Sequence, residues 1–373
     1  MRFLFACGGT AGHINPALAL AEKLKKIIPE CEIMFVGSGR EMENRLIPAE
    51  GYRLENITIT GFSRSLSLKG IASNFITAKN LLISQKQSYK ILDKFNPDVV
   101  IGTGGYVCYP VLKAASKRKI PTILHESNAV PGLTTKMLSK VVNEMLVAFE
   151  GAKENYKRKD NIKVVGTPVR GQFELLTKSE AKKLIGITDR PLVISFWGSL
   201  GASYMNAVMK EFIRLNTKEK LFYHIHATGG GAEGEAKMKN ALLEEGVQDY
   251  NVNTDIRAYI NNMGVLMRAA DLVMCRAGAS TIAELTLVGV PSILIPSPNV
   301  TNNHQEANAR EVEKAGAAKM ILEKDCTGES LYNTVKELIN SKDSLKTMSE
   351  NAGKLGAVGS TDRILEIILS YVK

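Results

Sequence analysis

Three glycine-rich turns each follow a short apolar run and precede a helical pattern. They are residues 8–12 (Gly-Gly-Thr-Ala-Gly), 102–106 (Gly-Thr-Gly-Gly-Tyr) and 198–202 (Gly-Ser-Leu-Gly-Ala). Glycine lets backbone N–H groups and a helix N-terminus approach an anion closely, and the partial positive charge of the helix end stabilises it. The turns therefore predict phosphate or pyrophosphate binding, although any one of them could simply be a tight turn. His13 follows the first turn and is either a general base beside that anion or a residue that only orders the loop.

A fourth turn, Arg276-Ala-Gly-Ala-Ser-Thr-Ile-Ala-Glu284, joins an apolar run to a helix start. A carboxylate at Glu284 could accept two hydrogen bonds from a ribose diol. The alternative is a capping box, in which Thr281 and Glu284 close the helix N-terminus. Gln305 stands in an amide-rich segment, residues 302–308, which suits sugar hydroxyls or is a polar loop. The backbone N–H groups that could bind phosphate are those of Ala279, Ser280 and Thr281.

Two familiar nucleotide sites and the usual metal clamp are absent from the sequence. The apolar run 33–36 continues into Gly37-Ser38-Gly39, so no Asp or Glu stands where a dinucleotide fold would hold a ribose. No glycine turn continues into the Gly-Lys-Ser or Gly-Lys-Thr of a Walker loop. No Asp-x-Asp pair occurs either. We therefore expect neither a cofactor nor a metal ion.

Short apolar runs alternate with amphipathic helical patterns, such as residues 17–28 and 76–95, along the whole chain. This alternation predicts an α/β protein with two doubly wound parallel-sheet domains, which bind ligands at the carboxyl ends of their strands. The Gly166-Thr-Pro turn, with Ser179 as the next helix N-cap, divides the chain into domains 1–165 and 166–358, followed by a terminal helix in 359–373. Strands are expected at 3–6, 32–36, 99–101, 122–124 and 145–147, and again at 192–196, 221–225, 272–275 and 292–295.

The charge composition indicates which class of partner the protein binds. Among 373 residues, 48 Lys and Arg outnumber 38 Asp and Glu, which favours an anionic partner without choosing among phosphates, nucleic acid and acidic lipid. No apolar run approaches the ~20 residues of a membrane-spanning helix, and the N-terminus enters a strand without a signal-peptide pattern. We expect a cytosolic protein that touches a membrane only from its surface. Five cysteines without a CxxC pair are expected to be reduced and mostly buried.

Taken together, the motifs resemble one bacterial family, the peptidoglycan N-acetylglucosaminyltransferases that convert lipid I to lipid II. The resemblance spans essentially the whole chain and implies the GT-B architecture: two Rossmann-like domains facing a cleft, with the last helix crossing back to the first domain. Ser127, Trp197 and His304 depart from the family pattern. The motifs are Gly-Gly-Thr-Ala-Gly-His13, Gly-Gly-Tyr106, His125-Glu-Ser-Asn128, Gly-Thr-Pro-Val-Arg170, Gly-Ser-Leu-Gly-Ala202, Arg276-x-Gly-Ala-x-Thr-x-x-Glu284 and Gln305-x-x-Asn308.

The resemblance also implies substrates and roles. The donor would be UDP-N-acetylglucosamine and the acceptor lipid I, whose N-acetylmuramic acid 4-hydroxyl attacks with inversion. His13 is the first candidate for the base, with Glu126 and Tyr106 as alternatives, and helix N-termini with Arg170 would stabilise the departing UDP. On the donor side the implied contacts are Ser199 and residues 279–281 with the diphosphate, Glu284 with the ribose, the Ile260 backbone with uracil, Gln305 with the sugar, and Asn128 and Arg170 across the cleft. The implied contacts with the acceptor diphosphate are Thr10, Ala11 and Gly12.

A lipid acceptor implies a peripheral site on the cytoplasmic face of the cell membrane, with anionic inner-membrane lipids rather than nucleic acid as partners. Candidates are Phe62, Leu66, Leu68, Phe75 and Leu82, interleaved with Arg64, Lys69, Lys79, Lys86 and Lys90, together with Lys117-Arg118-Lys119. Much of 70–95 could instead be a solvated helix face whose apolar side lies in the core. Two other functions stay open: a UDP-N-acetylglucosamine 2-epimerase, which would need acidic residues at the anomeric centre, and a sensor that binds the nucleotide sugar without turnover.

Overall fold

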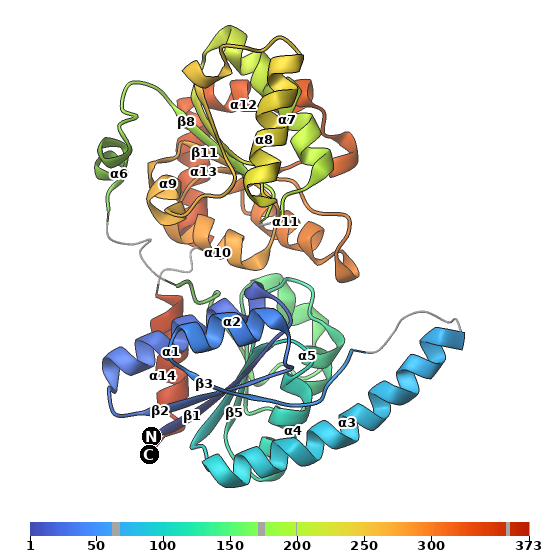
Figure 1. The fold of residues 1–373 in the computed structure, drawn as a ribbon. Coiled ribbons are helices and arrows are strands. Elements are labelled where there is room, and N and C mark those ends of the chain that lie inside the picture. The colour runs from blue at the N-terminus through green and yellow to red at the C-terminus, as the bar shows by residue number, and fades with distance from the viewer. Residues whose placement is uncertain (62–67, 171–175, 199, 356–358, 373) are drawn as a thin grey trace. The chain divides into compact units, whose positions relative to one another are not determined.

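The computed structural model describes residues 1–61, 68–170, 176–198, 200–355 and 359–372. The chain divides into two compact units (Figure 1). Unit 1 comprises residues 1–170 together with the C-terminal segment from residue 357, and unit 2 comprises residues 171–356. None of the helices in the described ranges is long and apolar enough to cross a bilayer.

Unit 1 is built on a seven-stranded parallel sheet of order β3-β2-β1-β4-β5-β6-β7. The order reverses between β1 and β4, which is the switch point where doubly wound folds bind ligands. The strands are β1 (Arg2–Cys7), β2 (Glu32–Gly37), β3 (Arg53–Asn56), β4 (Val99–Gly104), β5 (Thr122–Glu126), β6 (Glu144–Val147) and β7 (Ile162–Val164). The helices are α1 (Ala11–Ile27), α2 (Glu41–Ala49), α3 (Leu68–Phe95), α4 (Cys108–Lys117), α5 (Leu133–Leu138) and α14 (Ser360–Leu369).

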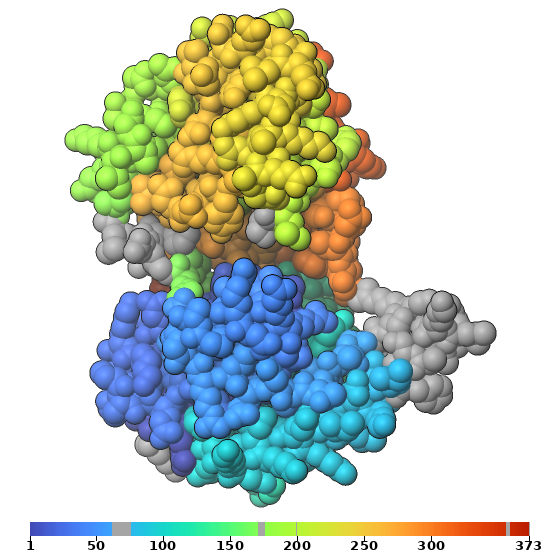
Figure 2. Space-filling model, viewed as in Figure 1, coloured from blue at the N-terminus to red at the C-terminus, as the bar shows by residue number. Residues whose placement is uncertain are grey.

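Two apolar layers cover this sheet, because successive side chains of a buried strand point to opposite faces. Phe3 and Phe5 of β1 pack against α1 and α14, while Leu4 of the same strand faces α4. The last helix, α14, belongs to this core through Ile364 and its neighbours, and Ser360 Oγ donates a hydrogen bond to the Thr167 carbonyl at 3.0 Å. Figure 2 shows residues of α1, α2 and α3 at the visible surface of unit 1.

Unit 2 repeats the plan with a six-stranded parallel sheet of order β10-β9-β8-β11-β12-β13, whose switch point lies between β8 and β11. Its core centres on Phe212, Phe222 and Tyr332 beneath the sheet. The strands are β8 (Leu192–Phe196), β9 (Tyr223–Ala227), β10 (Thr254–Arg257), β11 (Leu272–Cys275), β12 (Ser292–Leu294) and β13 (Ala318–Met320). The helices are α6 (Lys178–Ile185), α7 (Ser203–Glu219), α8 (Gly231–Glu244), α9 (Met263–Ala269), α10 (Ala279–Val288), α11 (His304–Lys314), α12 (Gly328–Asn340) and α13 (Lys342–Leu355).

The predicted fold class is confirmed, and the differences are local. Four short strands went unpredicted, and all four, β3, β7, β10 and β13, are the edges of the two sheets. The helix α6 begins after Thr177, whose hydroxyl accepts from the Glu180 N–H, so the predicted N-cap at Ser179 is wrong. Thr177 prevails because it forms a reciprocal capping box with Glu180.

The strand β9 lies two residues later than predicted. The prediction missed its end because two of its five residues are buried histidines, which do not continue an apolar run. Ser195 Oγ lies 2.9 Å from His224 Nε2 and 2.7 Å from His226 Nδ1, and both imidazoles are fully buried. Burial lowers the pKa of His226 to about 3 and also lowers the pKa of His224. Neutral, hydrogen-bonded histidines therefore behave here as core residues, which a pattern of apolar letters does not reveal.

Candidate active site

His13 lies in the first turn of α1, at the carboxyl edge of the unit 1 sheet. Its Nδ1 atom is 2.8 Å from the Gly8 carbonyl oxygen, and Thr103 Oγ1 donates to the His13 carbonyl at 2.7 Å. Because a carbonyl only accepts, Nδ1 carries the proton in this contact, and Nε2 is the nitrogen that could serve as a base. The ring packs on Gly104, where an added Cβ would lie 2.3 Å from His13 Cδ2. The histidine is thus held in one tautomer with its basic nitrogen turned from Gly8.

The first glycine turn keeps three N–H groups without an internal partner. Thr10 is the N-cap of α1 in an extended conformation, and Ala11 and Gly12 are its first two helical residues. Within the described ranges no acceptor reaches the N–H groups of these three residues, as expected at a helix start. The Gly9 N–H differs, because it donates to the Glu43 carboxylate at 2.7 Å. An anion at this turn would therefore meet residues 10–12.

The other two candidates for the base end neighbouring strands of the same sheet edge. Tyr106 follows β4 with 48% of its side chain exposed, and its ring lies against Gly61. Glu126 ends β5, is 6% exposed, and accepts hydrogen bonds from Asn128 through the backbone N–H at 3.1 Å and the side-chain amide at 3.0 Å. Since β1, β4 and β5 are adjacent, the structure brings all three candidates to one edge.

The residues around Glu126 have structural partners. His125 is fully buried, and its Nε2 lies 2.8 Å from the Gly166 carbonyl oxygen, which ties β5 to the turn after β7. Burial lowers the pKa of His125, so the ring is a neutral core group. Ser127, one of the departures from the family pattern, places its Oγ 3.4 Å from His125 Nδ1.

Arg170 is not brought to the glycine turns of unit 1. Its guanidinium pairs with Glu50, which caps the C-terminus of α2, and its Nε lies 3.7 Å from a Glu22 oxygen on α1. Glu22 stands nine residues beyond His13, about 14 Å along the helix at 1.5 Å per residue. A role for Arg170 at a leaving diphosphate stays a prediction and would require these ion pairs to open.

Unit 2 contains a pocket of about 580 Å³ at its own switch point. Ala279, Ser280 and Thr281 open α10 after the N-cap Gly278, and the described residues provide no acceptor for their N–H groups. Ser280 Oγ is also buried without a partner. The residues around the pocket are Phe196, Trp197, Gly198, Gly201, Ala202, Ser203, Tyr204, Arg276, Gly278, Thr281, Ser297, Asn299, Gln305 and Glu323.

Glu284 is a half-buried carboxyl one turn inside α10. Burial raises its pKa to about 7, and no described group donates a hydrogen bond to it. The capping-box alternative is wrong, because Gly278 is the N-cap of α10 and Thr281 is already its third helical residue. An unpartnered carboxyl of this kind can accept hydrogen bonds from hydroxyl groups of a ligand.

The remaining donor-side candidates lie on the same unit, except Asn128 and Arg170. Gln305 begins α11 and faces the pocket, with its Oε1 accepting from the Ser297 N–H at 2.9 Å. Ile260 follows β10 and is 2% exposed, so only its backbone is suited to a ligand. Asn308 is fully buried and donates to the Ala277 carbonyl at 3.2 Å, which holds α11 to the turn before α10. Ser199 lies outside the described residues.

Arg276 and Glu323 of this pocket form an ion pair that the sequence did not predict. Arg276 pairs with Glu323 and donates to the carbonyls of Ile295 and Pro296 at 3.2 and 3.3 Å, so its charge is already compensated. The guanidinium lies 5.9 Å from the ring of Trp197, which is 3% exposed. Arg276 was visible in its motif, but Glu323 stands 47 residues away without any motif of its own.

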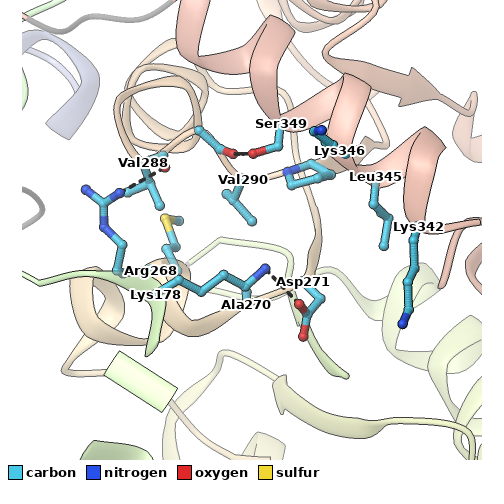
Figure 3. Close-up of a pocket in the computed structure, with 13 residues that line it drawn as sticks. Lys178, Arg268, Ala270, Asp271, Val288, Val290, Lys342, Leu345, Lys346 and Ser349 are labelled. Carbon is cyan, nitrogen blue, oxygen red and sulfur yellow. Dashed lines mark hydrogen bonds and ion pairs between the residues drawn. The ribbon is translucent and has the colours of Figure 1, made fainter. Parts of the chain in front are cut away.

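A second hollow of unit 2, about 510 Å³, lies at the opposite edge of the sheet (Figure 3). It adjoins the residues that precede β11 and β12, and Lys178 Nζ pairs there with Asp271 at 2.7 Å. None of the predicted site residues line it. In the described parts of the chain, no three His, Cys, Asp or Glu side chains gather in a way that could hold a metal ion.

Two doubly wound parallel-sheet domains, each with helix N-terminal N–H groups that find no partner among the described residues at its switch point, form the architecture of GT-B glycosyltransferases. The chain belongs to glycosyltransferase family 28: residues 3–147 match the family's N-terminal domain and residues 192–364 its C-terminal domain. The resemblance found in the motifs is thereby confirmed.

Curated relatives match the chain over its whole length. One from Acetivibrio thermocellus is 44% identical over 100% of this chain and 99% of its own, and one from Thermoanaerobacter sp. (strain X514) is 44% identical over 99% and 100%. Both are named UDP-N-acetylglucosamine--N-acetylmuramyl-(pentapeptide) pyrophosphoryl-undecaprenol N-acetylglucosamine transferase.

Two solved structures share the fold of this chain. The crystal structure of MurG from Acinetobacter baumannii is similar with a TM-score of 0.77 and 25% identity, covering 99% of this chain and all of that one. The UDP-GlcNAc 2-epimerase from Neisseria meningitidis bound to UDP-GlcNAc has a TM-score of 0.66 at 17% identity, covering 99% of this chain and all of that one. At that identity the epimerase shares the fold alone.

Proposed function

We propose that the protein transfers N-acetylglucosamine from UDP-N-acetylglucosamine to the N-acetylmuramic acid 4-hydroxyl of lipid I, with inversion, forming lipid II and UDP. The names of the full-length relatives support the substrates. The observation that carries the proposal is the start of α10, whose residues Gly278 and Thr281 line the pocket of unit 2. The N–H groups of residues 279–281 have no partner among the described residues, and the unpartnered Glu284 carboxyl follows one turn later. These groups are complementary to a diphosphate and a ribose diol.

The donor would occupy this pocket in an extended arrangement. The N–H groups of residues 279–281 would bind the diphosphate, and Glu284 would accept from the ribose hydroxyls. The backbone at Ile260 would pair with uracil and Gln305 would contact the sugar, with Ser199 a further candidate for the phosphates. Charge developing on the departing UDP would then be stabilised by the N-terminus of α10.

On the acceptor side, residues 10–12 would bind the diphosphate of lipid I and His13 would act as the base. Nε2 accepts the proton of the attacking 4-hydroxyl, while the oxygen of that hydroxyl bonds to the anomeric carbon of the donor sugar from the face opposite UDP. The bond from that carbon to the diphosphate oxygen breaks, and its electron pair leaves with UDP. The Gly8 carbonyl, 2.8 Å from Nδ1, stabilises the imidazolium that forms. Glu126 and Tyr106 stay the alternative bases.

The decisive experiment combines the protein with UDP-N-acetylglucosamine and a short-chain lipid I analogue. A transferase releases UDP and forms a disaccharide on the analogue. A 2-epimerase would change the sugar of the donor without an acceptor, and a sensor would bind the donor without turnover. Absence of the disaccharide with both substrates bound would refute the proposed function.

We also propose that unit 1 binds the cytoplasmic face of the membrane through anionic lipids. Ile76 and Leu82 of α3 are 60% and 71% exposed, and Leu133 and Met137 of α5 are 66% and 45% exposed. The helix α4 contacts both α3 and α5. Exposed lysines lie on the same helices, a combination that suits an anionic bilayer surface. They are Lys79, Lys86, Lys90, Lys117 and Lys136, and Arg118 and Lys119 directly follow α4.

One side of α3 packs into unit 1 while another side stays exposed and available to a membrane. Thr77, Ser84, Ser88 and Leu92 form the buried stripe of α3, and three of these four residues are polar. The apolar Ile76 and Leu82 are exposed instead, so the alternative in which the apolar side of residues 70–95 lies in the core holds only in part. Phe62, Arg64 and Leu66 lie outside the described residues, as do the side chains of Leu68, Lys69 and Phe75.

Co-sedimentation with vesicles tests the membrane proposal. We expect binding to vesicles that contain phosphatidylglycerol, weaker binding to pure phosphatidylcholine, and a loss in Leu82→Ser together with Leu133→Ser. Equal binding to both kinds of vesicle would contradict the role of anionic lipids.

A further inference from the structure

Glu43 is a fully buried carboxylate that joins two loops of the candidate acceptor site. It lies in the first turn of α2. Its Oε1 accepts hydrogen bonds from the Gly9 N–H and the Ser38 hydroxyl, both at 2.7 Å. Its Oε2 accepts from the backbone N–H groups of Ser38 at 2.5 Å and Arg40 at 3.4 Å. One side chain therefore fastens the turn after β1 to the turn after β2.

The glycines around Glu43 leave room for its carboxylate. An added Cβ at Gly8 would lie 2.4 Å from Oε1, and one at Gly37 would lie 2.8 Å from Oε2. Gly9, which donates to Oε1, has a φ of +91°, a conformation that side chains disfavour. The close approach of carboxylate and backbone is thus a property of these turns and not an accident of one contact.

The hydrogen bonds of Glu43 lead directly to the groups expected to act on the acceptor. Fixing Gly9 also fixes the peptide on either side of it. One contains the Gly8 carbonyl, which accepts a hydrogen bond from His13 Nδ1–H, and the other leads to Thr10, the N-cap of α1. Because the Gly9 N–H is occupied, an incoming diphosphate is directed to the N–H groups of residues 10–12. A buried carboxylate with four donors around it holds such a conformation strongly.

We propose that Glu43 is a positioning residue for the transfer reaction. It holds the turn of residues 8–12 so that His13 keeps its Nδ1–H tautomer and the three free N–H groups face the acceptor diphosphate. This inference rests on the proposed function, which supplies the acceptor and the base. Glu43 itself touches neither substrate.

Glu43→Gln tests the proposal, because it keeps the shape of the side chain but removes the charge and turns an NH₂ group toward N–H donors. We expect turnover with a short-chain lipid I analogue to fall about 10- to 100-fold, as for lost hydrogen bonds to a charged group, with donor affinity within about twofold of wild type. Glu41→Gln, an exposed glutamate in the same turn of α2, is the matched control and should stay at wild-type turnover.

The split between acceptor chemistry and donor binding is the discriminating readout. Loss of folded protein would lower both in proportion, whereas displacement of one turn lowers turnover alone. Wild-type turnover in a folded Glu43→Gln variant, or equal losses in turnover and donor binding, would overturn the inference. If that variant does not fold, Ser38→Ala removes one donor to Oε1 and should give the same split at about 3- to 10-fold. Failure of the wild-type protein to form the disaccharide would instead refute the proposed function.

Discussion

Replacing Glu284 by glutamine should stabilise the protein above neutral pH while weakening donor binding. The carboxyl is half-buried, and burial raises its pKa from the ordinary 4.5 to about 7. Because the folded-state pKa is the higher one, ionisation costs stability. The cost is absent below about pH 4.5, grows as the pH rises, and is complete above about pH 7. Glutamine removes the ionisation and with it this cost.

The magnitude follows from the pKa. A change from 4.5 to about 7, at about 1.4 kcal/mol for each pH unit, sets an upper limit of about 3 kcal/mol. Glu284 is partly open to water, which screens the effect, so we expect Glu284→Gln to be more stable than wild type by about 1–2 kcal/mol at pH 8. The gap should close toward pH 5. Most substitutions destabilise, so a gain in stability is a demanding prediction.

Trp197 provides the assay, because it is the only tryptophan of the sequence, belongs to the core of unit 2 and lines the candidate donor pocket. Urea unfolding followed by its fluorescence at pH 5 and pH 8 gives the stability of that unit. Titration with UDP-N-acetylglucosamine gives the donor affinity, which should fall about 10- to 100-fold without the charged acceptor. Glu244→Gln, an exposed glutamate at the end of α8, serves as the control.

Two results would refute the reasoning separately. A Glu284→Gln variant that is no more stable than wild type at pH 8 would show that the carboxyl is not penalised by burial. An unchanged donor affinity would show that it does not bind the ribose, whatever its effect on stability. Glu284→Ala should weaken donor binding to a similar extent with the fold intact, since α10 does not depend on this residue for its cap.

Three further predictions concern the reaction. His13→Ala should lower turnover at least ~100-fold with donor affinity retained, and His13→Gln should shift or abolish the acidic limb of the pH–rate profile. Near-normal turnover with an unchanged acidic limb would leave Glu126 as the next candidate for the base. Gly104→Ala should lower turnover without affecting donor binding, because its Cβ would lie 2.3 Å from His13 Cδ2 at a φ of +125°; wild-type turnover would show that the ring tolerates displacement. Activity should persist in EDTA, and a loss restored by Mg²⁺ would reveal ligands that the sequence and the described residues do not show.

The interior of both sheets was predictable because parallel strands buried on two faces form continuous apolar runs. The edge strands were not: β3 is Arg-Leu-Glu-Asn and β10 is Thr-Asp-Ile-Arg, each with charged residues that an edge exposes to water. Their existence depends on pairing with β2 and β9, which no local pattern encodes. The amphipathic pattern at residues 17–28 marks only the later turns of α1, which begins at Ala11, because glycine and histidine at positions 12 and 13 do not continue the apolar periodicity.

The glycine motifs located both candidate sites, yet the glycines themselves do not explain anion binding. Gly8 makes room for the Glu43 carboxylate, Gly104 for the His13 ring, and Gly201 for the Thr228 carbonyl, 2.3 Å from an added Cβ. These glycines allow close contacts between parts of the protein, not contacts with a ligand. The features that suit a diphosphate are the N–H groups at the starts of α1 and α10 that find no partner among the described residues. Whether an N–H group is already occupied, as that of Gly9 is, depends on a carboxylate 34 residues away, and only the fold reveals it.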